Sequence, residues 1–285
     1  MDTESSFIVS PMTQRISLEA GEVYHGSIKV ANPADATKDF NYKVEVSAYS
    51  VKNENYNADF LSENDRTRIK DWITVENPSG TIKPNESIRV NYTINVPNDA
   101  PGGGQYAALL VSSDPESETN EGVAVKNVFE MACVIYAEVS GETTRKGEIT
   151  GNNVPGFAAS IPIKVSGSVK NDGNIHEIAR VGLEVRSVFS ETPIYPKPNE
   201  SGVVEETILP DTSRTISRDI DGISSLGIYV VKQTIEYMGE TSVVEKTVVA
   251  CPIWFMILVL ATISAIVYSV VKTIRKKHRR RMIFE

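Results

Sequence analysis

Apolar and polar residues alternate along two clear stretches of the chain, residues 40–48 (FNYKVEVSA) and 88–96 (IRVNYTINV). The apolar positions of the two stretches are Phe40, Tyr42, Val44, Val46 and Ala48, and Ile88, Val90, Tyr92, Ile94 and Val96. A period of two over eight or nine residues is typical of half-buried antiparallel strands. We therefore predict two strands whose apolar faces meet in one core.

The rest of the first half of the chain reads as further strands separated by turns. The other predicted strands are Phe7–Ser10, Val23–Val30, Trp72–Val75, Gln105–Ser112 and the long run Val123–Val139. The breaks between them are rich in Asn, Pro and Gly, as in Asn77-Pro78-Ser79-Gly80, which favours turns. Only Leu61–Lys70 has a charged, weakly helical pattern, and we expect one or two helical turns there.

A second set of short strands follows Gly151. Its members are Ser160–Val169, Ala179–Val188, Val203–Leu209, Arg214–Ile220, Gly227–Met238 and Ser242–Val249. Six or seven strands in about 100 residues are typical of an immunoglobulin-like sandwich. The segments 27–32 (SIKVAN) and 166–171 (SGSVKN) both read Ser-x-x-Val-x-Asn before a turn. This repeated motif suggests that the two sets of strands form two copies of one fold.

The predicted fold class is therefore all-β, with two tandem immunoglobulin-like β-sandwich domains followed by one C-terminal transmembrane helix. The predicted divisions are an N-terminal extension 1–6, domain 1 at 7–140, domain 2 at 141–248, the membrane helix at 249–271 and a basic tail at 272–285. A short, stiff linker is expected near Gly141–Gly151.

The membrane helix is predicted from 25 residues without a charge between Lys246 and Lys272. A helix of that length reaches roughly 37 Å, enough for a hydrocarbon core of about 30 Å. The Cys251–Val271 part is almost wholly apolar, and Trp254 and Tyr268 lie near its two ends, where amphipathic rings prefer to be. We expect this segment to be the contact with the membrane.

The charges around the span predict its orientation. Seven Lys and Arg residues lie in 272–285, which places that tail in the cytoplasm and residues 1 to about 250 outside. Residues 1–6 have neither the basic nor the apolar region of an export signal. Two interpretations remain: an exported chain whose signal has been removed, which the basic tail favours, or a tail-anchored protein in the cytoplasm.

The charge of the ectodomain argues against nucleic acid as a partner. Residues 1–271 contain 22 Lys and Arg against 36 Asp and Glu, a net charge of −14. Such a surface repels phosphates. The two cysteines, Cys133 in an apolar run and Cys251 at the membrane boundary, are not expected to pair. An exported domain without disulfides fits a Gram-positive bacterial surface.

The search for catalytic or metal-binding motifs finds none that fits. The histidines His25, His176 and His278 lie in separate regions, and no nucleophile motif accompanies them. The glycines 102–104 lack the Gly-Lys-Ser/Thr ending of a phosphate loop. The segment 219–222 (DIDG) resembles a calcium loop, but Ile228 occupies the position that needs a Glu. We predict no catalytic, cofactor-binding or metal-binding residues, no cofactor and no enzymatic activity.

Two further motifs have a plain structural interpretation. The acidic residues between 114 and 121 are expected to form a solvated hairpin loop. The segment 209–213 (LPDTS) resembles a sortase signal, but it ends in Ser and lies nearly forty residues before the helix. We therefore expect the helix to be the anchor.

The first domain resembles the N-terminal domain of bacterial WxL-interacting proteins and, more distantly, pilus-chaperone and sperm-protein sandwiches. The residues that carry the resemblance are Phe7-Ile8-Val9-Ser10-Pro11, Leu18-Glu19-Ala20-Gly21-Glu22, Val30-Ala31-Asn32, Ile82-Lys83-Pro84-Asn85-Glu86-Ser87, Ile94-Asn95-Val96-Pro97 and Gly103-Gly104-Gln105-Tyr106. The resemblance implies peptidoglycan as a partner of the first domain, host proteins as partners of the second, and WxL surface proteins as further partners.

These observations predict a membrane-anchored bacterial cell-surface binding or adhesion protein without catalytic activity. Rigid sandwiches expose loops and sheet edges, and an edge strand can pair with a partner's strand. The expected partners are other surface proteins, with WxL-type proteins, peptidoglycan and host proteins as candidates. The alternatives are a cell-wall-binding or assembly-chaperone module, and a tail-anchored cytoplasmic adaptor of sperm-protein type.

Overall fold

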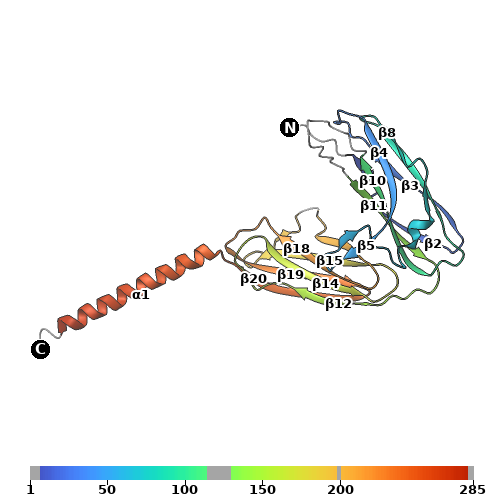
Figure 1. The fold of residues 1–285 in the computed structure, drawn as a ribbon. Coiled ribbons are helices and arrows are strands. Elements are labelled where there is room, and N and C mark those ends of the chain that lie inside the picture. The colour runs from blue at the N-terminus through green and yellow to red at the C-terminus, as the bar shows by residue number, and fades with distance from the viewer. Residues whose placement is uncertain (1–6, 114–129, 198–199, 282–285) are drawn as a thin grey trace. The chain divides into compact units, whose positions relative to one another are not determined.

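The computed structural model describes residues 7–113, 130–197 and 200–281, and it is built almost entirely of strands before one C-terminal helix (Figure 1). The chain divides into two compact units. Unit 1 contains residues 1–148, 170–178 and 207–214, and unit 2 contains residues 149–169, 179–206 and 215–285. The predicted all-β class with a C-terminal helix is confirmed.

Unit 1 contains two sheets that enclose a core. Sheet A has the strand order β1 (Ile8–Ser10), β3 (Val23–Ala31), β9 (Ser87–Asn95) and β7 (Ile73–Val75). Sheet B has the order β2 (Thr13–Leu18), β11 (Glu130–Val139), β10 (Gly103–Ser113), β4 (Phe40–Ala48) and β8 (Ser79–Ile82). A small hairpin, β5 (Ser50–Lys52) and β6 (Asn57–Asp59), and the 3₁₀ helix η1 (Arg68–Trp72) complete the unit.

Unit 2 is formed around two further sheets. One contains β12 (Gly147–Asn153), β14 (Ile163–Asn171) and β18 (Thr212–Ile220). The other contains β13 (Phe157–Ala158), β20 (Glu240–Ala250), β19 (Gly227–Tyr237), β15 (Glu177–Ser187) and β16 (Pro193–Tyr195), and β17 (Val203–Ile208) pairs with β15. The helix α1 (Ile253–Arg281) follows β20 after two residues.

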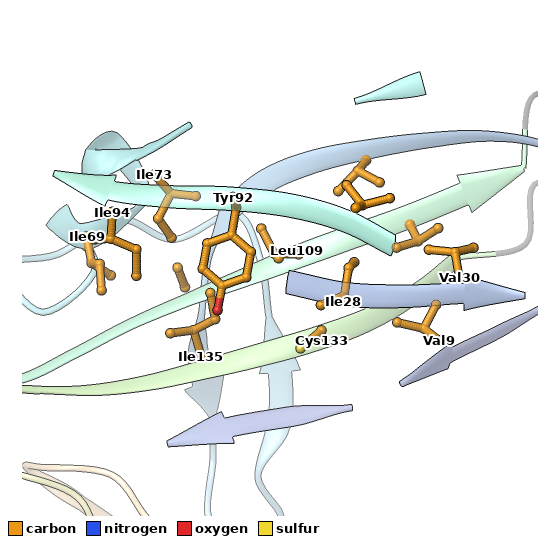
Figure 2. Packing of buried hydrophobic residues seen from close by; sticks show 14 of the residues in the cluster. Val9, Ile28, Val30, Ile69, Ile73, Tyr92, Ile94, Leu109, Cys133 and Ile135 are labelled. Atoms are coloured by element: carbon orange, nitrogen blue, oxygen red, sulfur yellow. The ribbon is translucent and has the colours of Figure 1, made fainter. Parts of the chain in front are cut away.

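The predicted strand phase in unit 1 is confirmed by the packing of its core. The residues predicted to face one another lie in one buried cluster, in which Phe40, Tyr42 and Val44 of β4 and Val90, Tyr92 and Ile94 of β9 are buried and Val46 is partly buried. Because β4 belongs to sheet B and β9 to sheet A, the two apolar faces meet across the sandwich. Figure 2 shows the Tyr92 ring directed from β9 toward Leu109 and Ile135.

Several strands were not predicted, and β2 is the most informative of them. Its buried residue Leu18 and its partly buried Gln14 and Ile16 alternate with more exposed ones, but Gln14 is polar and interrupts the apolar pattern. In the structure the Gln14 amide donates to the Ser27 carbonyl (3.1 Å), and its oxygen accepts from the Tyr92 hydroxyl (2.7 Å). A polar side chain can occupy an inward position when its hydrogen bonds are made there. Residues 147–151, which were expected in the linker, belong to β12.

The Ser-x-x-Val-x-Asn motif at 27–32 and 166–171 ends in both cases in a buried Asn with the same kind of hydrogen bonds. Asn32 is buried after β3, and its side-chain amide donates to the carbonyls of Lys38 (2.9 Å) and Ile82 (3.0 Å). Asn171 is buried at the end of β14, and its amide donates to the carbonyls of Ile175 (2.8 Å) and Ile208 (3.0 Å). Each Asn thereby donates to one loop carbonyl and to the carbonyl of the last residue of a strand.

The first prediction tests the strand phase. Replacing Ile94, which is fully buried, by Asp places a carboxylate in the apolar core of unit 1 and should destabilise that unit by several kcal/mol, against a domain stability of about 5–15 kcal/mol. Asn95→Asp, one residue further along, should cost little because this side chain is exposed. Hydrogen exchange of the β9 and β10 amides in the full-length protein measures both effects. Equal loss of protection in the two variants would show that the phase is wrong.

Candidate binding surface on the first unit

Sheet B of unit 1 is apolar on both faces at its centre. In β10, Ala107, Leu109 and Val111 point into the core between the sheets, whereas Tyr106 and Ala108 belong to a second cluster on the outer face. The neighbouring strand β11 shows the same division. A strand that is buried on both faces has a continuous apolar sequence, which explains why these two strands do not show the alternation of β4 and β9.

An aromatic cluster covers one end of this outer face. The Tyr49 and Tyr136 rings meet edge to face with centroids 5.7 Å apart, and Tyr106 meets Tyr136 in the same way at 5.9 Å. The Tyr136 hydroxyl donates to the Tyr49 hydroxyl (3.3 Å), and the Arg15 guanidinium lies 5.7 Å from the centre of the Tyr136 ring. Buried aromatic pairs of this geometry add stability beyond the area that they bury.

The same outer face is hollowed beside the aromatic cluster. A groove of about 840 Å³ lies between the segment that follows β6 and the outer face of β4 and β10. Its apolar lining includes Phe60, Leu61 and Leu110, and Glu45 and Glu130 lie at its polar margin. Leu61, which is 88% exposed, adds apolar surface to this lining. Apolar surface gathered in a groove can mark a binding site.

The buried carboxylate of Asp59 holds the segment that forms the groove wall. Its Oδ1 accepts from the Leu61 N–H (3.0 Å) and the Ser62 N–H (3.4 Å), and the Lys52 ammonium lies 3.0 Å from Oδ2. The hydrogen bonds from Ser62 and Leu61, with Lys52, keep the pKa of this carboxyl well below its usual range. The charged form therefore persists at neutral pH and fixes the position of Leu61.

Strand β11, whose Glu130 lines the groove, has an open edge on the side away from β10. Strand β2 pairs only with Val134–Val139, because the chain turns away before Thr13 to enter sheet A. The Val134 N–H donates to the Met12 carbonyl (2.9 Å), so the backbone groups of Ala132, two residues earlier, point to the same side. Among the described residues, no strand pairs with β11 on that side at 130–133. Such an edge can accept a strand from another chain.

His176 lies against the aromatic cluster of unit 1. Its ring centroid is 5.8 Å from that of Tyr106 and 5.3 Å from that of Tyr136. Burial, with the nearby Arg15 and Arg145, lowers the pKa of this histidine to about 4. His176 is therefore neutral at physiological pH, and it acts as part of the packing of the cluster.

The other candidates from the sequence are dispersed. His25 is on β3, where its Nδ1 lies 3.2 Å from the Thr93 hydroxyl oxygen. Cys133 is buried, and its burial raises the pKa of the thiol to about 11, so the reactive thiolate is scarce at neutral pH. Neither Cys133 nor Cys251 forms a disulfide. Within the described ranges, no group of three or more His, Cys, Asp and Glu side chains could hold a metal ion.

The turn motifs of the sequence have structural roles. Gly103 adopts a positive φ of 115° where β10 begins, and the N–H of Gly104 donates to the Asn174 carbonyl (2.8 Å). The segment 209–213 forms the turn between β17 and β18, with Leu209 buried and the Thr212 hydroxyl donating to its carbonyl (2.7 Å). Gly222 has a positive φ in the turn before β19. The acidic residues between 114 and 121 lie outside the described residues.

Comparison with known proteins finds a similarity to solved structures. Neither a family model nor a curated protein sequence matches it. A chain from the Salmonella enterica complex of the SafA pilin with the SafB chaperone has 14% identity and a TM-score of 0.41, covering 87% of this chain and 98% of that one.

Two other solved structures have similar values. A chain from the CsuC–CsuE chaperone–tip subunit complex of Acinetobacter baumannii has 14% identity and a TM-score of 0.38, covering 86% of this chain and 99% of that one. The E. coli chaperone DraB has 12% identity and a TM-score of 0.38, covering 85% of this chain and 97% of that one. Because all three TM-scores lie below 0.5, the fold class rests on the strands of this chain itself.

The second prediction concerns the pH dependence that His176 imposes. Its pKa is lowered in the folded state, so the unfolded chain, with an ordinary pKa near 6.5, binds the proton first as the pH falls. Stability should therefore decrease by about 2 kcal/mol between pH 7 and pH 5, and the decrease should end near pH 4. Hydrogen exchange of the β10 amides at several pH values measures this change.

A pair of variants isolates the contribution of His176. His176→Gln should remove most of this pH dependence, whereas His25→Gln, at the exposed histidine of β3, should retain it. An unchanged pH dependence in His176→Gln would contradict the assignment.

Proposed function

We propose that this chain is a membrane-anchored surface protein that binds an extended segment of another protein along unit 1. The open edge of β11 beside the groove supports this proposal most directly. The edge offers backbone donors and acceptors for a partner strand, and the groove offers apolar surface for the side chains of that strand. A strand ladder needs a polypeptide, which favours proteins over peptidoglycan as the ligand.

The proposed partners and source follow from the resemblance of the first domain to WxL-interacting proteins. In this proposal the partners are other surface proteins, with WxL-type proteins as the first candidates, the source is a Gram-positive bacterium, and the protein is not an enzyme. The sandwich domains are residues 7–140 and 141–248. Glu45 of the groove pairs with Lys43, so Glu130 is the carboxylate through which the groove favours a basic residue in the partner segment.

The helix α1 supports the anchoring part of the proposal. Its Ile253–Arg275 part is long and apolar enough to cross a membrane, with a mean hydropathy of 2.3, and none of its most apolar 18-residue stretch is buried against the rest of the chain. A core helix of a soluble protein would be mostly covered. The basic tail favours the cytoplasm for the C-terminus and the outside for both sandwiches.

The third prediction tests the groove with a matched pair of variants. Leu61 and Val23 are both exposed, so Asp at either position should change the stability by no more than about 0.5 kcal/mol. A photoreactive amino acid at Ala58, which is exposed and lines the groove, should cross-link one partner protein when the full-length protein is in its native membrane. Leu61→Asp should reduce this product strongly, whereas Val23→Asp, on sheet A, should not.

The same experiment tests the open edge. Ala132→Pro removes an N–H that faces the open side, so it should abolish the product while β10 keeps its protection from hydrogen exchange. A cross-linked product that is insensitive to both Leu61→Asp and Ala132→Pro would contradict strand addition at this site.

The fourth prediction concerns orientation. Protease added to intact cells with a loosened wall should release a fragment of about residues 1–248, because this part is expected outside. An antibody epitope at the C-terminus should survive in intact cells and be lost after permeabilisation. Protection of the whole chain in intact cells, with digestion only after permeabilisation, would instead support the cytoplasmic, tail-anchored alternative.

A further inference from the structure

Unit 2 has a group of exposed apolar side chains at the end from which the helix leaves. We name it the junction rim, and its members are Phe157, Val188, Phe189, Leu226, Ile228 and Val249. Phe189 is 85% exposed, and the others are between 38% and 48% exposed. They come from β13, from the turn after β15, from the turn before β19 and the start of β19, and from the end of β20.

The strand register brings these residues to one end of one sheet. At the end of β20, Val249 pairs with Ile228 of β19 and with Phe157 of β13. Strand β15 ends at Ser187 beside Tyr229, and the Val188 N–H donates to the Ile228 carbonyl (3.1 Å). Phe189 and Leu226 follow in the adjoining turns. The rim therefore surrounds the last residues of β20.

Both turns satisfy their own backbone groups. The Phe189 N–H donates to the Ser187 hydroxyl oxygen (3.3 Å), and the Leu226 N–H donates to the Ser224 hydroxyl oxygen (3.2 Å). The Tyr229 hydroxyl donates to the Ser224 carbonyl (2.9 Å). Turns with such internal hydrogen bonds can leave bulk water at lower cost, because fewer polar groups lose their partners.

The connection to the helix is too short to carry the rim away from the bilayer. Only Cys251 and Pro252 separate Ala250 from Ile253, a reach of at most about 11 Å. The Cys251 N–H is itself bound to the Ala158 carbonyl (2.9 Å). The apolar residues Ile253–Val271 form about 28 Å of helix, and a hydrocarbon core of about 30 Å is thick enough to enclose all of it. If α1 spans the bilayer, the hydrocarbon therefore begins near Ile253.

The charges near the rim indicate whether its contact with a membrane depends on anionic headgroups. The connecting segments 155–162, 187–192 and 221–226 contain no Lys or Arg, and their only charged residues are Glu191 and Asp221. Attraction to anionic headgroups therefore cannot hold the rim on a membrane. Apolar side chains with neighbouring serines suit the boundary between headgroups and acyl chains of a zwitterionic bilayer.

We propose that the junction rim enters the headgroup region of the bilayer, with Phe189 and Leu226 as its deepest side chains, so that unit 2 rests on the membrane surface. This proposal rests on the proposed membrane crossing by α1. The occupant is a lipid surface because the chain itself delivers the rim to the bilayer. A partner protein or a second copy would need a separate cause to bring it there.

The test uses the full-length protein in phosphatidylcholine vesicles. Cys251→Ser removes the accessible thiol, Cys133 is buried, and single variants Phe189→Cys and Leu226→Cys carry an environment-sensitive fluorophore. Both probes should emit at shorter wavelength than in water. Lipids with a nitroxide near the headgroup should quench both, without any requirement for anionic lipid.

Two control positions make the outcomes distinct. Val243 lies on β20, as Val249 does, and is 52% exposed. It precedes Val249 by six residues, about 20 Å along the strand, so a probe on Val243→Cys should not be quenched by the headgroup nitroxide. Ile263→Cys, near the middle of α1, should be quenched by nitroxides deep in the acyl chains.

If the Ile263→Cys probe is quenched but the rim probes behave like the Val243→Cys probe, the rim proposal is wrong and the membrane crossing stands. If the Ile263→Cys probe is not quenched, the crossing itself fails. A wavelength shift of the rim probes that depends on protein concentration and occurs without lipid quenching would assign the rim to a second copy and overturn the lipid contact.

Discussion

The central strands of sheet B have to be covered on both faces, and most features of unit 1 depend on this constraint. The inner face is covered by sheet A, which brings Tyr92 and Ile94 against Leu109 and Ile135 (Figure 2). The outer face is covered at one end by the aromatic cluster and the segment after β6. Where that cover ends, the groove under Leu61 begins. The candidate binding surface is thus the part of the outer face that the described residues leave uncovered.

Buried polar groups fix the connections around this apolar framework. Asn32 and Asn171 each donate to one loop carbonyl and one carbonyl at a strand end, and Asp59 accepts the amides that position the groove wall. Gln14 links β2 to β3 and β9. In each case a side chain provides the partner that a loop or strand end lacks within the sheet. Substitution at such positions costs more than the loss of one hydrogen bond, because the remaining groups stay buried without partners.

The two proposed surfaces have different physical requirements. The edge of β11 needs a polypeptide that supplies a strand, and the acidic margin of its groove selects against an acidic segment. The junction rim of unit 2 needs only an apolar, uncharged boundary, which a bilayer supplies beside the first turn of α1.

The sequence by itself determined the features that depend on local periodicity. The phase of residues 40–48 and 88–96 and the presence of an apolar helix near the C-terminus can be read from neighbouring positions along the chain. The predicted bounds of the helix, 249–271, are wrong, because residues 249–250 complete β20 and the helix runs over Ile253–Arg281. The same reasoning missed β2, since the inward Gln14 is recognisable only once Tyr92 and Ser27 lie beside it.

Only the tertiary structure decided where the surfaces lie. The open edge of β11 arises because the chain leaves sheet B before Thr13, and the junction rim arises because the register aligns the ends of β15, β19 and β20. Leu61, Phe189 and Leu226 look like ordinary apolar residues of short loops in the sequence. Their significance comes from pairings between residues far apart in the chain, and a local pattern of hydrophobicity contains no information about such pairings.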